Sequence, residues 1–274
     1  MTVAPVARVP RALTIAGSDS GGGAGIQADL KTFAALGVYG ASAITALTAQ
    51  NTLGVTAIHE APASFVAEQI DAVMADIGAD AWKTGMLANA EIVEVVADRA
   101  ARWEVTNLVV DPVMISKSGH RLLREDAIEA YRRLLIPRAL VVTPNTHEAA
   151  ALVGRPVETW DDVREAARAL VEMGARIAVV TGGDRAGPAT DLYYDGSGFH
   201  EFAAGRVDTT NDHGTGCTFA SAIAAALARG EEPKKAVALA KSYVTKALQA
   251  AYPVGRGHGP VHHFYRFWRP VAAG

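Results

Sequence analysis

Short apolar runs alternate along this chain with longer segments in which apolar residues recur every three or four positions. The short runs predict strands at 12–16, 41–47, 108–111, 139–143, 177–181 and 192–194. The longer segments predict helices at 26–34, 65–77 and 163–173. Because strands that are apolar on both faces alternate with helices, the pattern predicts an α/β fold with a mostly parallel sheet between two helical layers.

The segment 190–202 departs from this alternation. Two short apolar runs flank Asp195-Gly196-Ser197-Gly198, a sequence rich in turn-forming residues. This arrangement predicts a small β-hairpin. No internal repeat, low-complexity tract or linker divides the chain, so we expect residues 1–274 to form a single domain.

Polar residues and glycines directly follow four of the predicted strands. They are Gly17-Ser18-Asp19, Asp111-Pro112, Pro144-Asn145 and Gly182-Gly183. In open α/β sheets, ligands bind beyond the carboxyl ends of the strands. The sequence therefore predicts that the four segments after these strands face one shared cleft.

Composition narrows the possible partners and the compartment. Hydrophobic residues make up 50% of the chain and charged residues 20%, which supplies a large core and argues against disorder. The net charge of −3 provides no general attraction to nucleic acid or to an anionic membrane. The first ten residues do not resemble a secretory signal. Cys217 is the only cysteine and cannot form an internal disulfide, which fits a reducing cytoplasm.

A first glycine-rich loop spans 17–25, between a predicted strand and a predicted helix. Within it, Gly23-Ala24-Gly25-Ile26-Gln27-Ala28 matches a loose dinucleotide-binding fingerprint, so a Rossmann oxidoreductase has to be considered. However, no acidic residue ends a second strand at the expected distance, and the loop lacks the Gly-Lys-Ser/Thr ending of a Walker loop. The sequence favours a turn in which glycine lets the backbone approach another group closely.

A second glycine-rich loop, 211–218, precedes the strongly helix-forming segment 219–227. Glycines before a helix leave backbone N–H groups exposed at the positive end of the helix dipole, which suits the charge that builds up in phosphoryl transfer. Cys217 falls in the first turn, where the dipole favours its thiolate, and could take a proton from a substrate hydroxyl. The alternative is a glycine-rich cap over a small buried cysteine.

Asn145 and Glu148 are three residues apart at the start of a predicted helix. The spacing is typical of a capping box, in which Asn145 caps the helix and Glu148 reaches back. In the alternative, both side chains face the cleft and order the waters around Mg²⁺, an ion that takes few protein ligands. From spacing alone, the capping box is favoured.

Other polar residues have two interpretations each. Asp111 could act electrostatically near phosphates or could open the turn at Pro112. Lys83 and Lys117 lie near glycines and could reach a phosphate, although such lysines are more often solvated.

Three histidines near the carboxyl end, at 258, 262 and 263, suggest a metal cluster at first sight. They lack a helical ligand spacing and a nearby carboxylate, which favours a packed tail. A serine hydrolase is poorly supported, because no Gly-x-Ser-x-Gly elbow follows a strand.

Taken together, these segments resemble the hydroxymethylpyrimidine/phosphomethylpyrimidine kinases of thiamine biosynthesis, within the ribokinase-like superfamily. The resemblance runs from about 12 to 263. Its most specific parts are the motifs at 12–20, 25–32, 48–52, 111–114, 143–145, 213–218 and 257–263. Several independent motifs in the same order make chance similarity an inadequate explanation.

The resemblance implies a ribokinase-like three-layer α/β/α sandwich and a cytoplasmic enzyme. It implies ATP and Mg²⁺ as co-substrates and two successive phosphorylations in one site. The first would convert 4-amino-5-hydroxymethyl-2-methylpyrimidine to its monophosphate, and the second would form the diphosphate. A small pyrimidine and ATP would be the partners, with no nucleic acid or membrane, and superfamily relatives suggest a homodimer by analogy.

The resemblance also assigns residues to the substrate. Gln50 matches the glutamine that hydrogen-bonds the aminopyrimidine, since an amide that both donates and accepts can bind a ring nitrogen and an amino group together. Asp29 matches a carboxylate of the substrate pocket. Four further residues match the pocket wall: Gly17, Ala24, Met86 and Val113.

For the phosphoryl transfer, Cys217 occupies the place where many ribokinase-like enzymes carry an aspartate base. Gly214, Thr215 and Gly216 would form the anion hole before it. The resemblance reverses the capping-box interpretation and makes Asn145 and Glu148 the pair that organises Mg²⁺. Three more residues would be associated with the nucleotide and Mg²⁺: Asp111, Thr181 and Gly183. No metal site made only of protein ligands is expected.

Two positions depart from the family pattern. Thr181 stands where many members have lysine, so a phosphate contact is lost there or is taken up by Arg185 or Lys117. Asp212 stands where threonine is frequent and places a negative charge near the anion hole. The remaining alternatives are a pyridoxal or pyridoxamine kinase, a catalytically silent pyrimidine-binding protein and a nicotinamide-dependent oxidoreductase.

Overall fold

The computed structural model describes residues 8–115, 122, 125–183 and 187–271. Within these residues, nine strands form one sheet in the order β3-β2-β1-β4-β5-β6-β7-β8-β9. The strands are β1 (Arg11–Asp19), β2 (Tyr39–Asn51), β3 (Gly54–Glu60), β4 (Ala81–Thr84), β5 (Leu108–Val110), β6 (Val141–Val142), β7 (Ile177–Val180), β8 (Ala189–Tyr194) and β9 (Phe199–Ala204).

The centre of the sheet, from β2 to β7, is parallel, whereas β3, β8 and β9 pair antiparallel at its two ends. The predicted hairpin is confirmed as β8 and β9, joined by the turn that follows Tyr194. β3 and β4 are not among the predicted strands. β4 has only four residues, and one of them is Lys83, so it lacks the apolar run that marks the other central strands.

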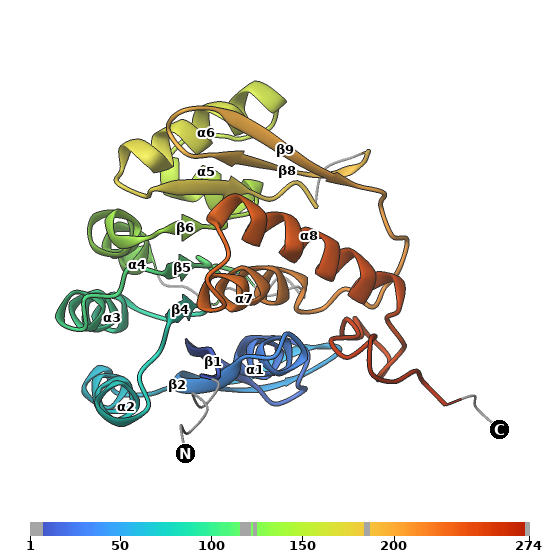
Figure 1. Ribbon diagram of the computed structural model, residues 1–274, viewed down its shortest axis with the longest axis horizontal. Helices are drawn as coiled ribbons and strands as arrows, with labels where there is room; N and C mark the ends of the chain where they lie inside the picture. Colours follow the sequence, from blue (N-terminus) through green and yellow to red (C-terminus); the bar gives the residue numbers. More distant parts are fainter. Residues whose placement is uncertain (1–7, 116–121, 123–124, 184–186, 272–274) are drawn as a thin grey trace, which may run out of the picture.

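Helices cover both faces of the sheet and confirm the three-layer α/β/α sandwich (Figure 1). One layer holds α1 (Gly25–Ala35), α7 (Thr215–Ala228) and α8 (Pro233–Gln249). The other holds α2 (Ala63–Asp76), α3 (Ala90–Arg102), α4 (Glu125–Ala130), the short turns η1 (Tyr131–Leu135) and η2 (Ile136–Arg138), α5 (Thr146–Val153) and α6 (Trp160–Glu172).

Strand residues pack alternately into two apolar cores, one on each side of the sheet. Leu13 and Val110 pack into the core beneath α2–α6, whereas their neighbours Ala12 and Val109 pack into the core beneath α1, α7 and α8. α7 is buried along most of its length and is rich in alanine, which allows close packing against both neighbouring helices. The carboxyl ends of the strands therefore rest on a closely packed scaffold.

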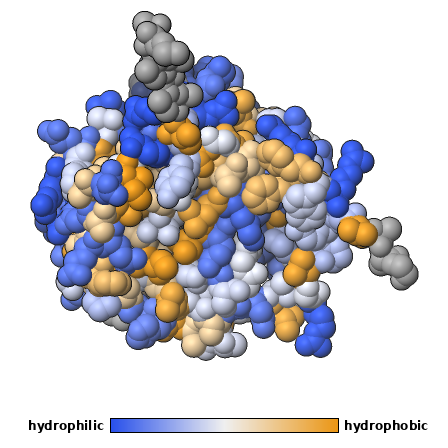
Figure 2. All heavy atoms as spheres, turned by 60° about the horizontal axis from the view of Figure 1, so that its bottom comes forward, coloured by the Kyte–Doolittle hydropathy of each residue, from blue (hydrophilic) through white to orange (hydrophobic). Residues whose placement is uncertain are grey.

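The surface does not divide into large zones of one polarity on the face shown in Figure 2. Hydrophobic residues occur there in small groups among hydrophilic ones. In the described part of the chain, none of the helices combines the length and the apolar character that a bilayer span requires.

Candidate active site

The two glycine-rich loops meet at the carboxyl ends of the parallel strands. Gly214, which caps α7, has a φ of 78°, a conformation that favours glycine. A Cβ atom at Gly214 would lie 1.9 Å from the carbonyl oxygen of Gly23 in the first loop. Thr215 and Gly216 follow in the first turn of α7. The structure therefore places the proposed anion hole directly against the loop at the end of β1.

Asp19, at the end of β1, holds the two loops together. Its carboxylate accepts hydrogen bonds from the backbone N–H groups of Gly21, Gly23 and Ala24, at 2.8–2.9 Å. Its Oδ2 atom also lies 2.9 Å from Nε2 of His213, in the second loop. No role was predicted for Asp19 or His213, and only their positions inside the two motifs could have indicated one.

The charge of Asp19 should make the stability of the contact between the two loops sensitive to acid. Burial opposes ionisation of Asp19, but the contacts with His213 and the backbone N–H groups outweigh it, so its pKa lies below the usual 3.8. A carboxylate whose pKa is lowered on folding stabilises the protein above its unfolded pKa, and this contribution is lost as the pH falls through the folded value.

We therefore expect Asp19→Asn to lower the free energy of unfolding by about 2 kcal/mol at pH 7, since the hydrogen bonds to a buried charged group are weakened. The difference from the wild type should shrink as the pH falls below about 3.8, because the wild-type carboxylate then protonates as well. Thermal unfolding of both proteins between pH 7 and pH 3 measures this. A difference that grows in acid would contradict the expectation.

Gln50 lies beside the second loop. Its Nε2 atom is 3.2 Å from Nε2 of His213, and its Oε1 atom accepts a hydrogen bond from the hydroxyl of Thr48 at 3.1 Å. Because His213 directly precedes Gly214, the structure brings Gln50 next to the start of α7. The residue expected to bind the pyrimidine and the expected anion hole thus share one edge of the sheet.

The residues expected in the pocket wall gather close to this edge. A Cβ atom at Gly17 would lie 3.0 Å from Sδ of Met86, so the glycine allows the methionine to pack against β1. Met86 belongs to a small apolar cluster in which Val113 also packs. Ala24 directly precedes α1, and its Cα lies close to Gly214.

Asp29 does not line an open surface. It is fully buried, and its carboxylate accepts hydrogen bonds from the hydroxyls of Thr14 and Ser221, both at 2.6 Å, and from Lys83 at 3.0 and 3.1 Å. This placement differs from the expected pocket carboxylate. Lys83 is fully buried as well, neither solvated nor reaching into open space. Lys117 and Arg185 lie outside the described residues.

Asp111 is the second carboxylate near Lys83. Its Oδ2 atom lies 3.7 Å from the Lys83 Nζ atom, beyond hydrogen-bond distance, and has no hydrogen-bond partner in the described part of the chain. Burial raises the pKa of Asp111 to about 6, with Lys83 acting in the opposite direction. Burial therefore disfavours the ionised form of this carboxylate, and added positive charge nearby would favour it.

Cys217 lies in the first turn of α7 and is half-buried. Burial raises the pKa of its thiol to about 12, whereas the Lys83 ammonium lowers it and the carboxylates of Asp111 and Asp29 raise it. The prediction that the helix terminus makes the thiolate the favoured form is wrong for this structure, because loss of hydration outweighs the favourable charges.

Asn145 and Glu148 form the capping box that their spacing indicates. The Asn145 side chain accepts a hydrogen bond from the Glu148 N–H at 2.9 Å, and the Glu148 carboxylate accepts one from the Asn145 N–H at 2.9 Å. Thr181 pairs with Asn145 through a short β-bridge. A Cβ atom at Gly183 would meet nothing within 4 Å, and the Gly183 carbonyl oxygen accepts a hydrogen bond from Arg206 at 2.9 Å.

The carboxyl-terminal histidines pack against the protein. His263 Nε2 lies 3.0 Å from the Thr218 hydroxyl, and His262 Nε2 lies 3.0 Å from the carbonyl oxygen of Trp268. His258 lies 2.9 Å from Asp212, so the negative charge that departs from the family pattern has a partner. In the part of the chain that the structure describes, no three His, Cys, Asp or Glu side chains are grouped to hold a metal ion.

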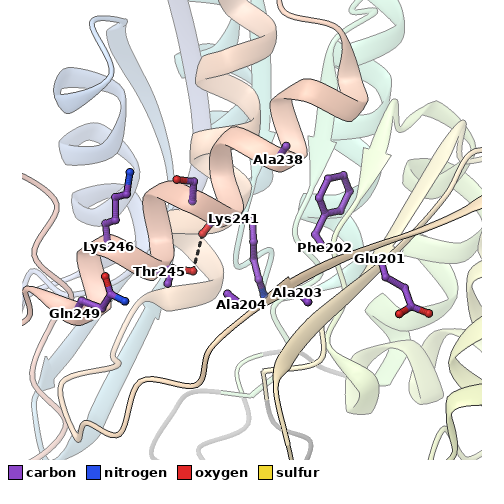
Figure 3. Close-up of a pocket in the computed structure, with 10 residues that line it drawn as sticks. Glu201, Phe202, Ala203, Ala204, Ala238, Lys241, Thr245, Lys246 and Gln249 are labelled. Carbon is purple, nitrogen blue, oxygen red and sulfur yellow. Dashed lines mark hydrogen bonds between the residues drawn. The ribbon is translucent and has the colours of Figure 1, made fainter.

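An open pocket lies between β9 and α8 (Figure 3). Its lining comes from β9 and from one face of α8: Glu201, Phe202, Ala203, Ala204, Ala238, Lys241, Ser242, Thr245, Lys246 and Gln249. Lys241 pairs with Asp191 at 2.8 Å, and Asp191 accepts a hydrogen bond from the Gly182 N–H at 3.2 Å. Through these contacts the pocket is linked to the segment Thr181–Gly183, which follows β7. The sequence alone does not predict this link.

Comparison with known proteins identifies the family of this chain. A model of the family Phosphomethylpyrimidine kinase matches residues 19–262. The hydroxymethylpyrimidine/phosphomethylpyrimidine kinase of Rhizobium meliloti is 52% identical over 94% of this chain and 98% of its own. The thiamine biosynthesis bifunctional protein ThiED of Geobacter sulfurreducens is 51% identical over 92% of this chain, which spans 51% of that relative's length.

A solved structure of the pyridoxal kinase from Staphylococcus aureus, in complex with AMP-PCP and pyridoxal, shares this fold. It superposes with a TM-score of 0.88 and 36% sequence identity, and the match covers 95% of this chain and 96% of the other. The fold and the sequence relatives confirm the resemblance that the motifs indicated. The chain belongs to the phosphomethylpyrimidine kinase family.

Proposed function

We propose that this protein uses ATP to phosphorylate 4-amino-5-hydroxymethyl-2-methylpyrimidine to its monophosphate and then to the diphosphate, in thiamine biosynthesis. The observation that carries the proposal is the meeting of Gln50 with the glycine-capped start of α7 at the carboxyl edge of the sheet. Membership of the kinase family and the names of the relatives support the substrate. By the same resemblance, the whole chain acts as one cytoplasmic kinase domain and pairs as a homodimer.

The start of α7 supplies the electrostatic part of the reaction. The N–H groups of the first turn, with the helix dipole behind them, stabilise the negative charge on the transferring phosphoryl group. Cys217 lies in the same turn. In the proposed step, the substrate oxygen attacks the γ-phosphorus of ATP, its proton passes to the Cys217 thiolate, and ADP leaves.

Gln50 supplies recognition of the pyrimidine. Its carboxamide can accept a hydrogen bond from the exocyclic amino group and donate one to a ring nitrogen. A ring without that amino group would leave the amide unpaired, which lowers kcat/KM. The apolar cluster of Met86 and Val113, with Gly17 beside it, would contact the ring itself.

The residues that follow β6 and β7 are suited to bind the phosphates of the nucleotide and Mg²⁺. Asn145 and Glu148 offer oxygen atoms of the kind that order waters around Mg²⁺, and Mg²⁺ would neutralise charge on the phosphates. Thr181 and Gly183 would lie along the phosphates, near the charge of Asp111. We propose that the nucleotide base enters the pocket between β9 and α8, whose volume of about 450 Å³ is within the usual range for ligand sites (Figure 3).

The main alternative acceptor is pyridoxal, because a pyridoxal kinase shares the fold at 36% identity. We expect kcat/KM for the hydroxymethylpyrimidine to exceed that for pyridoxal by at least about tenfold, the discrimination that one additional satisfied hydrogen bond provides. Initial rates of ADP formation with each acceptor measure both values. A preference for pyridoxal would overturn the assignment, and no ADP formation with either acceptor would indicate a binding protein.

A further inference from the structure

A buried ion pair lies between β4 and α1. The Lys83 ammonium and the Asp29 carboxylate are 3.0 Å apart, and both side chains are completely shielded from solvent. A buried ion pair is poor evidence for stability, because removing two charges from water costs as much as their attraction returns, and apolar side chains of similar size often serve as well. The position of this pair in the molecule is therefore the informative feature.

The pair is attached to the helix that carries Cys217. Ser221 lies one turn after Cys217 on α7, so the two side chains share one face of the helix. The Ser221 hydroxyl donates a hydrogen bond to Asp29 at 2.6 Å. On the other side, a Cβ atom at Gly85 would lie 2.8 Å from the Lys83 Nζ atom, so this glycine leaves the space that the ammonium occupies. The ammonium is thus held beside the first turns of α7.

Charged groups from three parts of the fold act on the Cys217 thiol. They are Lys83 from β4, Asp111 after β5 and Asp29 from α1, together with the backbone N–H of Gly25. The contact of Asp29 with both Lys83 and Ser221 places the ammonium close to the helix face that carries Cys217.

Asp111 has neighbours of its own. It is faced by Lys83 and Asp29 and by the buried hydroxyl of Tyr131 in η1. Within the described residues, Lys83 is the positive side chain that acts on the thiol.

We propose that Lys83 is a positioning residue for the phosphoryl transfer: its ammonium, anchored by Asp29, is the counter-charge for the thiolate form of Cys217, which accepts the proton of the substrate hydroxyl. The inference rests on the proposed role of Cys217. The thiolate is strongly disfavoured by its burial, so a fixed positive charge nearby determines how much of it forms.

Alkylation of Cys217 tests this without any turnover. Because Cys217 is the only cysteine, the rate of modification by iodoacetamide, followed by mass spectrometry, reports on this thiol alone. At fixed pH, we expect Cys217 of Lys83→Met to be alkylated at least about threefold more slowly than Cys217 of the wild type. A rise of about one unit in the thiol pKa lowers the thiolate fraction tenfold, and greater nucleophilicity offsets part of that loss. Asp29→Asn should be alkylated faster, because a carboxylate that disfavours the thiolate is removed.

Opposite changes in the two variants separate this role from a structural one. Loss of folding would accelerate alkylation in both, since an exposed thiol has a pKa of about 8.5. Should Lys83→Met fail to fold, Lys83→Met/Asp29→Asn removes both charges together and is expected to react more slowly than the wild type, because the proposed counter-charge of the thiolate is absent. Folding of each variant is checked by circular dichroism.

A folded variant without Lys83 that reacts at the wild-type rate or faster would overturn the proposal. The pH dependence of kcat provides a second measurement: the rise of kcat with pH should move to higher pH in Lys83→Met, with little change in KM. Failure of the proposed function is distinguishable from failure of this inference, because the alkylation rate is independent of which substrate the enzyme phosphorylates.

Discussion

Cys217→Ser should lower kcat for phosphorylation of the hydroxymethylpyrimidine by about 100-fold or more, the usual contribution of a general base. A serine hydroxyl has nearly the shape of the thiol but does not ionise in the accessible pH range, so it cannot accept the proton. The dissociation constant of the pyrimidine should stay nearly unchanged, because the proposed recognition depends on Gln50. Steady-state kinetics and isothermal titration of the pyrimidine measure the two effects separately.

Two further measurements sharpen this test. Because the pKa of the Cys217 thiol is raised to about 12, the wild-type kcat should increase as the pH rises above neutrality, and this increase should be absent from Cys217→Ser. Cys217→Asp places a different base at the same position and should recover part of the lost kcat. Turnover of Cys217→Ser close to that of the wild type would assign the proton transfer to another group.

Gly214→Ala should impair both the fold and the reaction. The residue has a φ of 78°, and its new methyl group would lie 1.9 Å from the Gly23 carbonyl oxygen, so the two loops would have to separate. We expect a loss of about 3 kcal/mol in the free energy of unfolding, from backbone strain and the clash together. We also expect kcat/KM to fall by about 100-fold, because the N–H groups of α7 are displaced from the phosphoryl group.

Gly216→Ala is the matched control for stability. It lies two residues further along, in the first turn of α7, and an added Cβ atom would meet nothing within 4 Å. Alanine also favours a helix over glycine, so the free energy of unfolding should stay the same or rise by up to about 1 kcal/mol. Thermal and denaturant unfolding compare the two variants. A Gly214→Ala protein as stable as Gly216→Ala would show that the close contact between the loops is not required.

Most of the fold could be predicted from local patterns, because long parallel strands are apolar on both faces and the helices between them are amphipathic. β4 could not be predicted in this way. Its four residues include Lys83, which is tolerated inside the protein because Asp29, far away in the sequence, pairs with it and Asp111 lies nearby. A pairing of this kind depends on the tertiary structure and leaves no periodic signal.

The site was predicted in outline, through the residues that follow the strands. The details that escaped depend on burial. Cys217 has the position of an activated thiol, but partial burial among neighbouring carboxylates raises its pKa. Asn145 and Glu148 form a capping box in this structure, which neither favours nor opposes the role in Mg²⁺ binding that the resemblance implies. Asp19 lies in a recognisable motif, but its link to His213 spans 194 residues of sequence.

That long-range link bears on how the protein is made. All nine strands of the described sheet lie before residue 205, whereas the start of α7 and His213 come later in the chain. During synthesis, every strand of the supporting sheet therefore leaves the ribosome before the groups that act on phosphate. Premature termination after β9 would yield a chain that retains every strand but lacks the means to transfer a phosphoryl group.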